Sequence, residues 1–355
     1  MIELVENARR NVAAVANVAQ VYTNYEIGRQ IVEEEQGGKC RADYGKKIIA
    51  DLSAKLTARF GRGWKTSNLE YMRKFYLMYS SRTISQTPFG KSEDDEKSAI
   101  PLRIFPDADD LVNNVYQIPK FSLSWSHYLK LMRIDDPDER RFYEIEAAEN
   151  KWSLKELQRQ FDSALYQRLA LSKDKDKVRD LAKRGQVIEK PEDLVKDPYI
   201  LEFLGLPEQA AYTESELEQQ IIDHLRDFLL ELGKGFAFIG RQVRMTFNEH
   251  HFWIDLVFYN RLLRCFVLLD LKIGELKHQD IGQMQMYVNH YDRKVKLPDE
   301  NKTIGILLCA DKDDAIVEMT LPEGDRQIFA SKYRTILPSK AQLKALLKAS
   351  GQTTA

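Results

Sequence analysis

The sequence predicts a mixed α+β protein in which an all-α region of helix-turn-helix type precedes a sheet flanked by helices. Two observations predict this fold class. Apolar residues recur three and four positions apart through the first half of the chain, which is typical of amphipathic helices. From about residue 235 onward, apolar runs separated by polar or glycine-containing breaks indicate strands. We therefore expect two domains of different architecture.

The composition bounds the class of protein. At 355 residues and 43% hydrophobic residues, the chain is long enough for more than one domain. It has no apolar stretch of about 18 residues and no signal-peptide pattern at its start, so we expect no membrane partner. Three widely spaced cysteines, Cys40, Cys265 and Cys309, predict reduced thiols in a cytoplasmic chain. Because the net charge is −1, any nucleic-acid surface must be a local patch.

The first three predicted helices have a helix-turn-helix layout. One helix covers about 4–35 and a second covers about 43–60, which stops at Gly61-Arg62-Gly63. A third begins at Ser67, because Ser67 and Glu70 have the spacing of a capping box. Two helices joined by a short glycine turn are typical of helix-turn-helix units.

A second group of helices follows a polar segment. Residues 82–100 contain few large apolar groups and predict a mobile surface loop. Helices are then expected at about 124–134, 138–149 and 153–170, the last beginning at a second capping box, Ser153 to Glu156. This group either forms its own helix-turn-helix or completes the first.

A charged stretch marks the expected boundary. Residues 172–198 begin with alternating lysine and aspartate and contain two prolines. The apolar run 199–204 is expected to dock on one of the domains. The predicted division is 1–171 for the helical domain, 172–206 for the linker and docking segment, and 207–355 for the sheet domain.

The C-terminal half predicts a helix, three strands, a helix and a strand. The expected elements are a helix at about 214–232, strands at 235–247, 251–260 and 263–273, a helix at 278–292 and a strand at 303–310. Weak strands at about 314–319 and 327–333 and a closing helix at 340–349 complete it.

Three charged residues lie inside the predicted apolar strands. Asp255 follows Ile254, and Asp270 and Lys272 lie in the next strand, two positions apart and so on one face. A buried unpaired charge costs roughly several kcal/mol, so such charges need a reason. If the strands pair, the two carboxylates converge on one cation. Oxygen ligands suit Mg²⁺ or Mn²⁺, and a nearby lysine suits the hydrolysis of a phosphodiester.

In this order of elements, Asp255 and Asp270-Leu271-Lys272 resemble the PD-(D/E)XK nuclease superfamily. The helix around Glu218 resembles the acidic first helix of that fold, and Gln283-x-x-x-Tyr287 resembles a helix found in several of its branches. Longer stretches resemble the YhcG-like bacterial nucleases. These stretches are Phe236–Gln242, Ile254–Leu256 and Gly282–Met284, with Tyr44–Gly45, Leu123–Tyr128 and Trp152–Leu154 in the helical half.

The resemblance implies a restriction-endonuclease-like αβββαβ domain and a set of roles. Asp255, Asp270 and Glu218 would hold Mg²⁺ or Mn²⁺, Lys272 would assist the attacking water, and Gln283 would steady it. Two departures stand out. Ile254 replaces a frequent proline, and Asp270 stands where members of this group tend to have glutamate; the superfamily accepts both acids.

Other interpretations remain for each of these residues. The two aspartates and the lysine could form a structural ion pair. Ser215 and Glu218 have capping-box spacing, so Glu218 could only cap its helix, with Glu214 and Glu216 as competitors. Gln283 could be an ordinary polar helix residue. At the level of the chain, the rival to a nuclease is a catalytically silent nucleic-acid-binding or assembly protein.

The helical half is expected to contact nucleic acid, DNA in the first instance. The basic residues expected to reach it flank the first turn or lie along the start of the last helix: Arg62, Lys65, Arg73, Lys74, Lys155 and Arg159. The expected function is that of a metal-dependent DNA endonuclease, and a homo-oligomer is one arrangement open to it. A role in defence against foreign DNA, or in repair and recombination, is implied by the resemblance alone.

Overall fold

The computed structural model describes residues 1–37, 42–80, 120–171, 175–208, 211–322 and 324–337. Contacts divide the chain into two units, Met1–Leu157 and Gln158–Ala355. The predicted boundaries at 171 and 206 stay a prediction. The predicted loop at 82–100 and the closing helix at 340–349 lie outside the described residues.

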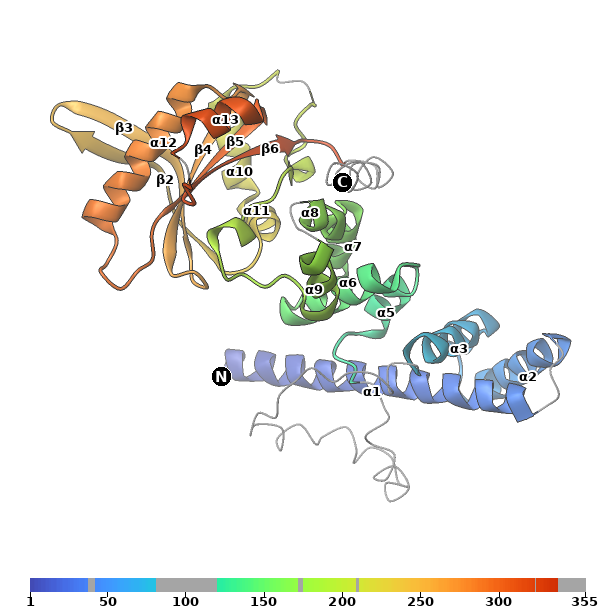
Figure 1. Ribbon diagram of the computed structural model, residues 1–355. Coiled ribbons are helices and arrows are strands. Elements are labelled where there is room, and N and C mark those ends of the chain that lie inside the picture. The colour runs from blue at the N-terminus through green and yellow to red at the C-terminus, as the bar shows by residue number, and fades with distance from the viewer. Residues whose placement is uncertain (38–41, 81–119, 172–174, 209–210, 323, 338–355) are drawn as a thin grey trace. The chain divides into compact units, whose positions relative to one another are not determined.

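The first unit is helical. Its helices are α1 (Ile2–Gly37), α2 (Ala42–Phe60), α3 (Thr66–Tyr79), α5 (Trp125–Leu131) and α6 (Pro137–Glu149), followed by the start of α7 (Leu154–Asp162). These helices form where the apolar spacing predicts them (Figure 1).

The predicted capping boxes have opposite outcomes. The box at Ser153 is confirmed, because Ser153 N donates to Glu156 Oε2 over 2.7 Å and Glu156 N donates to Ser153 Oγ over 3.3 Å. The box at Ser67 is wrong. Helix α3 begins one residue earlier, with Lys65 at the N-cap position and no side-chain capping bond.

An aromatic cluster forms the core beside α1 and α3. The Phe75 ring packs against several other rings at centroid distances of 4.8–5.9 Å: Tyr25, Tyr79, Phe121, Trp125 and Tyr128. The two helices approach closely at Gly28, where a Cβ atom would lie 2.1 Å from the Met72 carbonyl oxygen. Only glycine fits at that crossing.

The second unit is a mixed six-stranded sheet with helices on both faces. Its strands are β1 (Tyr199–Ile200), β2 (Phe236–Phe247), β3 (His250–Asn260), β4 (Cys265–Glu275), β5 (Ile304–Asp311) and β6 (Ile328–Arg334). The order across the sheet is β1-β6-β5-β4-β3-β2. The pairs β2–β3 and β3–β4 are antiparallel, and the other three pairs are parallel, so β4 is the strand at which the sheet changes direction.

Helices cover the two faces of this sheet (Figure 1). Helices α10 (Glu214–Asp223) and α11 (Leu225–Leu232) pack with one apolar core, around Phe228 and Leu269. Helix α12 (His278–His290) packs with the other, around Met284 and Leu268. The remaining elements are α8 (Leu165–Leu171), α9 (Lys175–Arg184), α13 (Asp314–Thr320), two 3-10 turns at Pro191–Asp193 and Glu202–Leu204, and a π-turn at Tyr291–Val295.

Three predicted elements differ in the structure. The helix expected at 153–170 is broken between α7 and α8, where Ala164 has a φ of 51°. The helix expected at 214–232 is broken at His224, which lies outside helical geometry with a ψ of 30°. The strand expected at 314–319 is helix α13, because the Asp313 side chain accepts from Ala315 N over 2.9 Å and caps a helix there.

The apolar run at 199–204 docks as predicted, and it docks on the sheet. Tyr199 and Ile200 form the parallel edge strand beside Tyr333 and Arg334. Leu201 and Leu204 are buried in the same core as α10 and α11. Part of the predicted linker is therefore built into the sheet unit.

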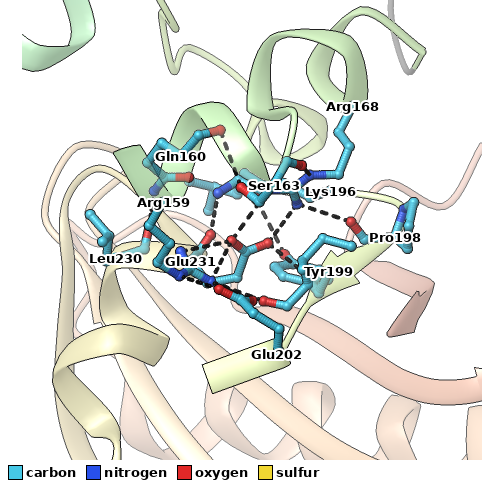
Figure 2. A network of polar contacts seen from close by, with 12 residues as sticks. Arg159, Gln160, Ser163, Arg168, Lys196, Pro198, Tyr199, Glu202, Leu230 and Glu231 are labelled. Carbon is cyan, nitrogen blue, oxygen red and sulfur yellow. Dashed lines mark hydrogen bonds and ion pairs between the residues drawn. The ribbon is translucent and has the colours of Figure 1, made fainter. Parts of the chain in front are cut away.

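A buried network of charges holds this segment to α11 (Figure 2). The fully buried Glu231 carboxylate accepts from Arg168 Nη1 over 2.6 Å and from Ile200 N over 3.0 Å. Arg159 lies 3.4 Å from it and also bonds Glu202, and the Lys196 ammonium donates to the Glu231 carbonyl. Burial by itself would raise the pKa of Glu231, but these cations outweigh burial and hold the pKa at about 2.

Candidate active site

The two aspartates of the strands meet where the β3–β4 ladder opens. The ladder pairs Leu256 with Leu269, and the next position in register brings Asp255 opposite Asp270. At that point Leu271 N donates to Asp255 Oδ2 over 2.8 Å, so a side chain takes the place of a strand partner. The Asp270 side chain is buried and lies within hydrogen-bonding reach of the Asp255 carboxylate.

The electrostatics of Asp270 are unfavourable for a negative charge. Burial, and then the neighbouring charge of Asp255, raise the pKa of Asp270 to about 7 despite the nearby Lys272. Lys272 Nζ lies 2.8 Å from Asp270 Oδ2 and 3.9 Å from Glu214 Oε2. Burial lowers the pKa of Lys272, but the carboxylates outweigh it and the pKa is raised overall. The lysine therefore carries its proton.

Glu218 reaches the same place from α10. It does not cap its helix, because Thr213 and Glu216 form the capping box, with Thr213 N donating to Glu216 Oε2 over 2.7 Å. Its side chain is 6% exposed and lies 3.0 Å from Arg241 Nε. The capping interpretation is thus wrong, and Glu218 is a buried acid that faces β2.

Gln242 joins these acids, and its place at the end of the stretch Phe236–Gln242 is its one mark in the sequence analysis. Its Nε2 donates to Glu218 Oε2 over 2.5 Å and to Asp255 Oδ1 over 3.0 Å. Gln242 adopts the left-handed conformation, with a φ of 46°, opposite Asp255 in the β2–β3 register. Such backbone is uncommon for a residue other than glycine and often occurs at functional sites. Only the strand register, which depends on a bulge after Phe238, brings the amide there.

Gln283 is connected to the site through Tyr287. The Gln283 side chain donates to the buried Tyr287 hydroxyl, which donates to the Trp253 carbonyl over 2.9 Å. Trp253 is two residues before Asp255 on the same strand. Burial raises the pKa of Tyr287, and the charges of Asp270 and Asp255 add to that effect. The tyrosine hydroxyl therefore lies close to the two aspartates.

The donor set fits a hard divalent cation. Among the described residues, no three histidine, cysteine, aspartate or glutamate side chains are grouped closely enough to enclose a metal. Magnesium sites often use only one or two carboxylates, with water and substrate phosphate completing the shell. Asp255 and Asp270 supply two carboxylates whose mutual repulsion a cation would relieve. Glu218 is held apart from them by the Gln242 amide.

The basic residues expected to contact nucleic acid differ in how they are held. Arg62, Lys65 and Lys155 are exposed. Arg73 Nε donates to Glu35 over 2.7 Å, and Lys74 Nζ donates to the Met132 carbonyl over 2.9 Å. Arg159 is largely buried in the Glu231 network, so its guanidinium is not presented to a ligand. Arg62, Lys65 and Lys155 are therefore the three basic side chains of this set that are open to a ligand.

Two further features bear on the sequence expectations. Cys265 and Cys309 are free and buried, and Cys40 lies outside the described residues. Within the described part of the chain, no helix is long and apolar enough to span a membrane.

Family models match both halves of the chain. The YhcG PDDEXK nuclease domain matches residues 192–348, and the DUF1016 N-terminal domain matches residues 1–168. A protein named "Putative nuclease YhcG", from Escherichia coli (strain K12), is 38% identical over 343 residues, which cover 97% of this chain and 90% of that protein.

Solved structures match part of the chain. A repair endonuclease from Pyrococcus abyssi is 18% identical with a TM-score of 0.24, over 38% of this chain and 50% of that one. A structure of EndoMS in apo form is 18% identical with a TM-score of 0.24, over 36% of this chain and 48% of that one. The similarity over the whole length is to the Escherichia coli protein, and on that ground the chain belongs to the YhcG family of PD-(D/E)XK nucleases.

Proposed function

We propose that this nuclease is a metal-dependent DNA endonuclease with its cutting centre at Asp255, Asp270 and Lys272. The observation that carries the proposal is the meeting of two carboxylates, one of them with a pKa raised to about 7, beside a protonated lysine. A structural ion pair would be expected to balance its charges. Here two acids crowd together, which is an arrangement that a divalent cation stabilises.

Each residue has a proposed role in phosphodiester hydrolysis. Asp255 and Asp270 would hold Mg²⁺ or Mn²⁺, which when bound lowers the pKa of water and neutralises phosphate charge. Lys272 donates hydrogen bonds to the attacking oxygen and to the phosphate oxygens that gain negative charge in the transition state. Glu218 completes the acidic set when Gln242 releases it, and Gln283 steadies the water from the Tyr287 side.

The helical half is proposed to bind the DNA substrate. Arg62 and Lys65 are exposed at the turn between α2 and α3, and Lys155 is exposed near the start of α7. Side chains of this kind bind phosphates and position a duplex without reading its sequence. A role in defence or in repair, and a homo-oligomer that cuts both strands, belong to the same proposal.

The test compares cleavage by the wild-type chain and the Lys272→Ala variant. Removing one transition-state donor costs roughly 10²–10³ in rate, so the variant should cut DNA at least about a hundredfold more slowly in Mg²⁺. Lys302→Ala, which removes an exposed lysine of the same unit, is the matched control and should cut like the wild type. Equal cleavage by Lys272→Ala and the wild type would sink the assignment.

A substrate panel separates DNA from RNA. We expect cleavage of plasmid DNA in Mg²⁺ or Mn²⁺, no cleavage in EDTA, and little cleavage of an RNA of matched sequence. Cleavage that favours the RNA would overturn the DNA part of the proposal and leave the cutting centre in place. Wild-type protein that cuts nothing and takes up no Mg²⁺ or Mn²⁺ in calorimetry is instead the catalytically silent protein.

A further inference from the structure

The β2–β3 hairpin carries an exposed polar and aromatic face beside the cutting centre. Met245 on β2 and Ile254 on β3 are buried in the core under α12. Strand side chains alternate, so the neighbours of these residues point to the opposite face. On that face Arg244 pairs with Trp253 and Thr246 pairs with His251. We call these four residues the hairpin cluster.

Contacts tie the hairpin cluster together while leaving it open to solvent. Arg244 Nη2 lies 3.0 Å and 2.9 Å from the two ring nitrogens of His251, and Thr246 Oγ1 lies 3.0 Å from His251 Nδ1. The His251 and Trp253 rings meet edge to face, with centroids 6.2 Å apart. Trp253 is nevertheless 47% exposed. The cluster thus presents a large ring and a cation side by side.

The hairpin cluster is continuous with Asp255. Trp253 and Asp255 flank the buried Ile254 on β3. They are two residues apart, which is about 7 Å along a strand. The Trp253 carbonyl accepts a hydrogen bond from the Tyr287 hydroxyl over 2.9 Å, and this bond holds the Trp253 backbone in place. A nucleic-acid strand bound at Asp255 would therefore extend to the Trp253 ring, whose backbone is held in place.

The chemistry of the hairpin cluster fits a nucleotide with an unpaired base. No carboxylate of the described residues forms an ion pair with Arg244, so its charge is available to a phosphate. An exposed indole offers a stacking surface, and a base can stack on a side chain only when its own faces are not covered by neighbouring bases. Within an uninterrupted duplex the base faces are covered. An acidic protein partner would use the cation but has no equivalent need for the ring.

We propose that the hairpin cluster binds an unpaired nucleotide of the strand being cut, with its base on Trp253 and its phosphate on Arg244. The inference rests on the proposed function and deepens it. The substrate class is DNA with a single-stranded stretch next to the cut, such as a single strand, a flap or a branch. The hairpin cluster selects the substrate, and the Asp255 centre cuts it.

The test measures binding without cleavage, in EDTA, for the full-length chain. Fluorescence anisotropy compares a labelled single-stranded DNA, a forked duplex and a blunt duplex of the same sequence. Trp253→Ala should weaken binding of the single strand and the fork by about tenfold or more, since one stacked base contributes that much. Binding of the blunt duplex should change little. Ile239→Ala removes another exposed apolar residue of β2 and is the matched control.

Two further variants distinguish a loss of binding from a loss of the fold. Trp253→Phe keeps an aromatic face and should restore most of the affinity for the single strand. Single-stranded DNA should also quench tryptophan fluorescence in the wild type, and Trp253→Phe should lose that quenching. Arg244→Gln should weaken single-strand binding and reduce the slope of log affinity against log salt by about one.

The outcomes separate this inference from the proposed function. If Trp253→Ala binds single strand, fork and duplex with the wild-type ratios, the hairpin cluster does not bind unpaired bases and the inference is overturned. The same result leaves the cutting centre untouched, because that centre depends on the rate of Lys272→Ala. A selective loss of single-strand binding in Trp253→Ala supports the inference, even in a protein whose cleavage has not been detected.

Discussion

Two buried carboxylates of the sheet unit lie in opposite electrical surroundings. Glu231 on α11 is surrounded by Arg168, Arg159 and Lys196, and its pKa is held at about 2 (Figure 2). Asp270 on β4 faces another acid, and its pKa is raised to about 7. Both side chains are almost fully removed from water. The difference between them is made by their neighbours and not by their depth.

The contrast distinguishes a structural charge from a chemical one. A buried ion that has its counter-ions stays ionised and holds elements together, although replacing the whole group by apolar residues can be neutral. A buried acid beside another acid gains little as structure and raises the energy of the folded state. Such an arrangement is retained where a ligand supplies the missing charge.

Removing the Glu231 carboxylate should cost the most stability. Glu231→Ala leaves the fully buried Arg168 guanidinium without its carboxylate, and breaking a buried pair from one side costs about 3–5 kcal/mol. The free energy of unfolding in urea measures the loss. Asp223→Ala, at an exposed acid on α10, should stay within about 0.5 kcal/mol of the wild type. A similar loss in both variants would contradict a special role for Glu231.

The pH dependence of stability should separate the two acids by sign. The pKa of Glu231 is depressed from 4.5 to about 2, so its contribution is present above pH 4.5 and is lost as the pH falls toward 2. The pKa of Asp270 is raised from 3.8 to about 7, so the folded state loses stability as the pH rises from 3.8 through 7.

The Asp270→Asn variant isolates the second effect. In EDTA it should lack that loss, and above pH 7 it should be roughly 2–4 kcal/mol more stable than the wild type. The measurement is the free energy of unfolding as a function of pH for the two proteins. Parallel curves for wild type and Asp270→Asn would show that the charge on Asp270 does not destabilise the folded state.

Divalent metal should stabilise the acid pair and leave the Glu231 network unaffected. At about a hundredfold excess of Mg²⁺ over its Kd, binding to the folded state adds about 2.7 kcal/mol, which raises the Tm. Asp255→Asn and Asp270→Asn should each remove most of this gain at pH 8. Glu218→Gln should remove less, because Gln242 and Arg241 hold Glu218 in contacts of its own. An equal Mg²⁺ shift in wild type and Asp270→Asn argues against the site.

The smallest effects are expected at Gln242. Gln242→Gly removes the amide that bridges Glu218 and Asp255, and hydrogen bonds to charged groups contribute about 1.5–3 kcal/mol to stability. Glycine adopts the φ of 46° without strain, which offsets up to about 1 kcal/mol of that loss, so the free energy of unfolding in urea should fall by about 0.5–2 kcal/mol. Gln242→Ala is the control: it loses the same bonds and keeps the strain, so it should be less stable than Gln242→Gly by up to about 1 kcal/mol. Wild-type stability in both variants would make the bridge incidental.

The sequence predicts much of the fold because most of its signals are local. The strands with Asp255 and Asp270 and the helix with Gln283 lie within a few residues of the predicted ranges. The errors arise where local signals compete. Ile316 and Val317 favour a strand by propensity, but the Asp313 cap starts a helix there.

The candidate site is predictable only in part. Charges stand out in apolar strands, so the sequence points to Asp255, Asp270 and Lys272. Gln242 escapes prediction because it reaches the acids through a bulge and a left-handed residue, and neither leaves a pattern in the chain. The buried position of Arg159 cannot be predicted for a related reason, because its acidic partners are 43 and 72 residues away.

The Glu231 network also decides where this protein can be divided. A fragment that begins at residue 192, where the nuclease-domain match starts, keeps Lys196 but lacks Arg159 and Arg168. Its α11 would then bury an acid that has lost two of its three cations. A fragment that begins at residue 158 keeps all three. For protein engineering, fragments and domain swaps of this chain should be joined before Arg159, so that Glu231 keeps all three cations.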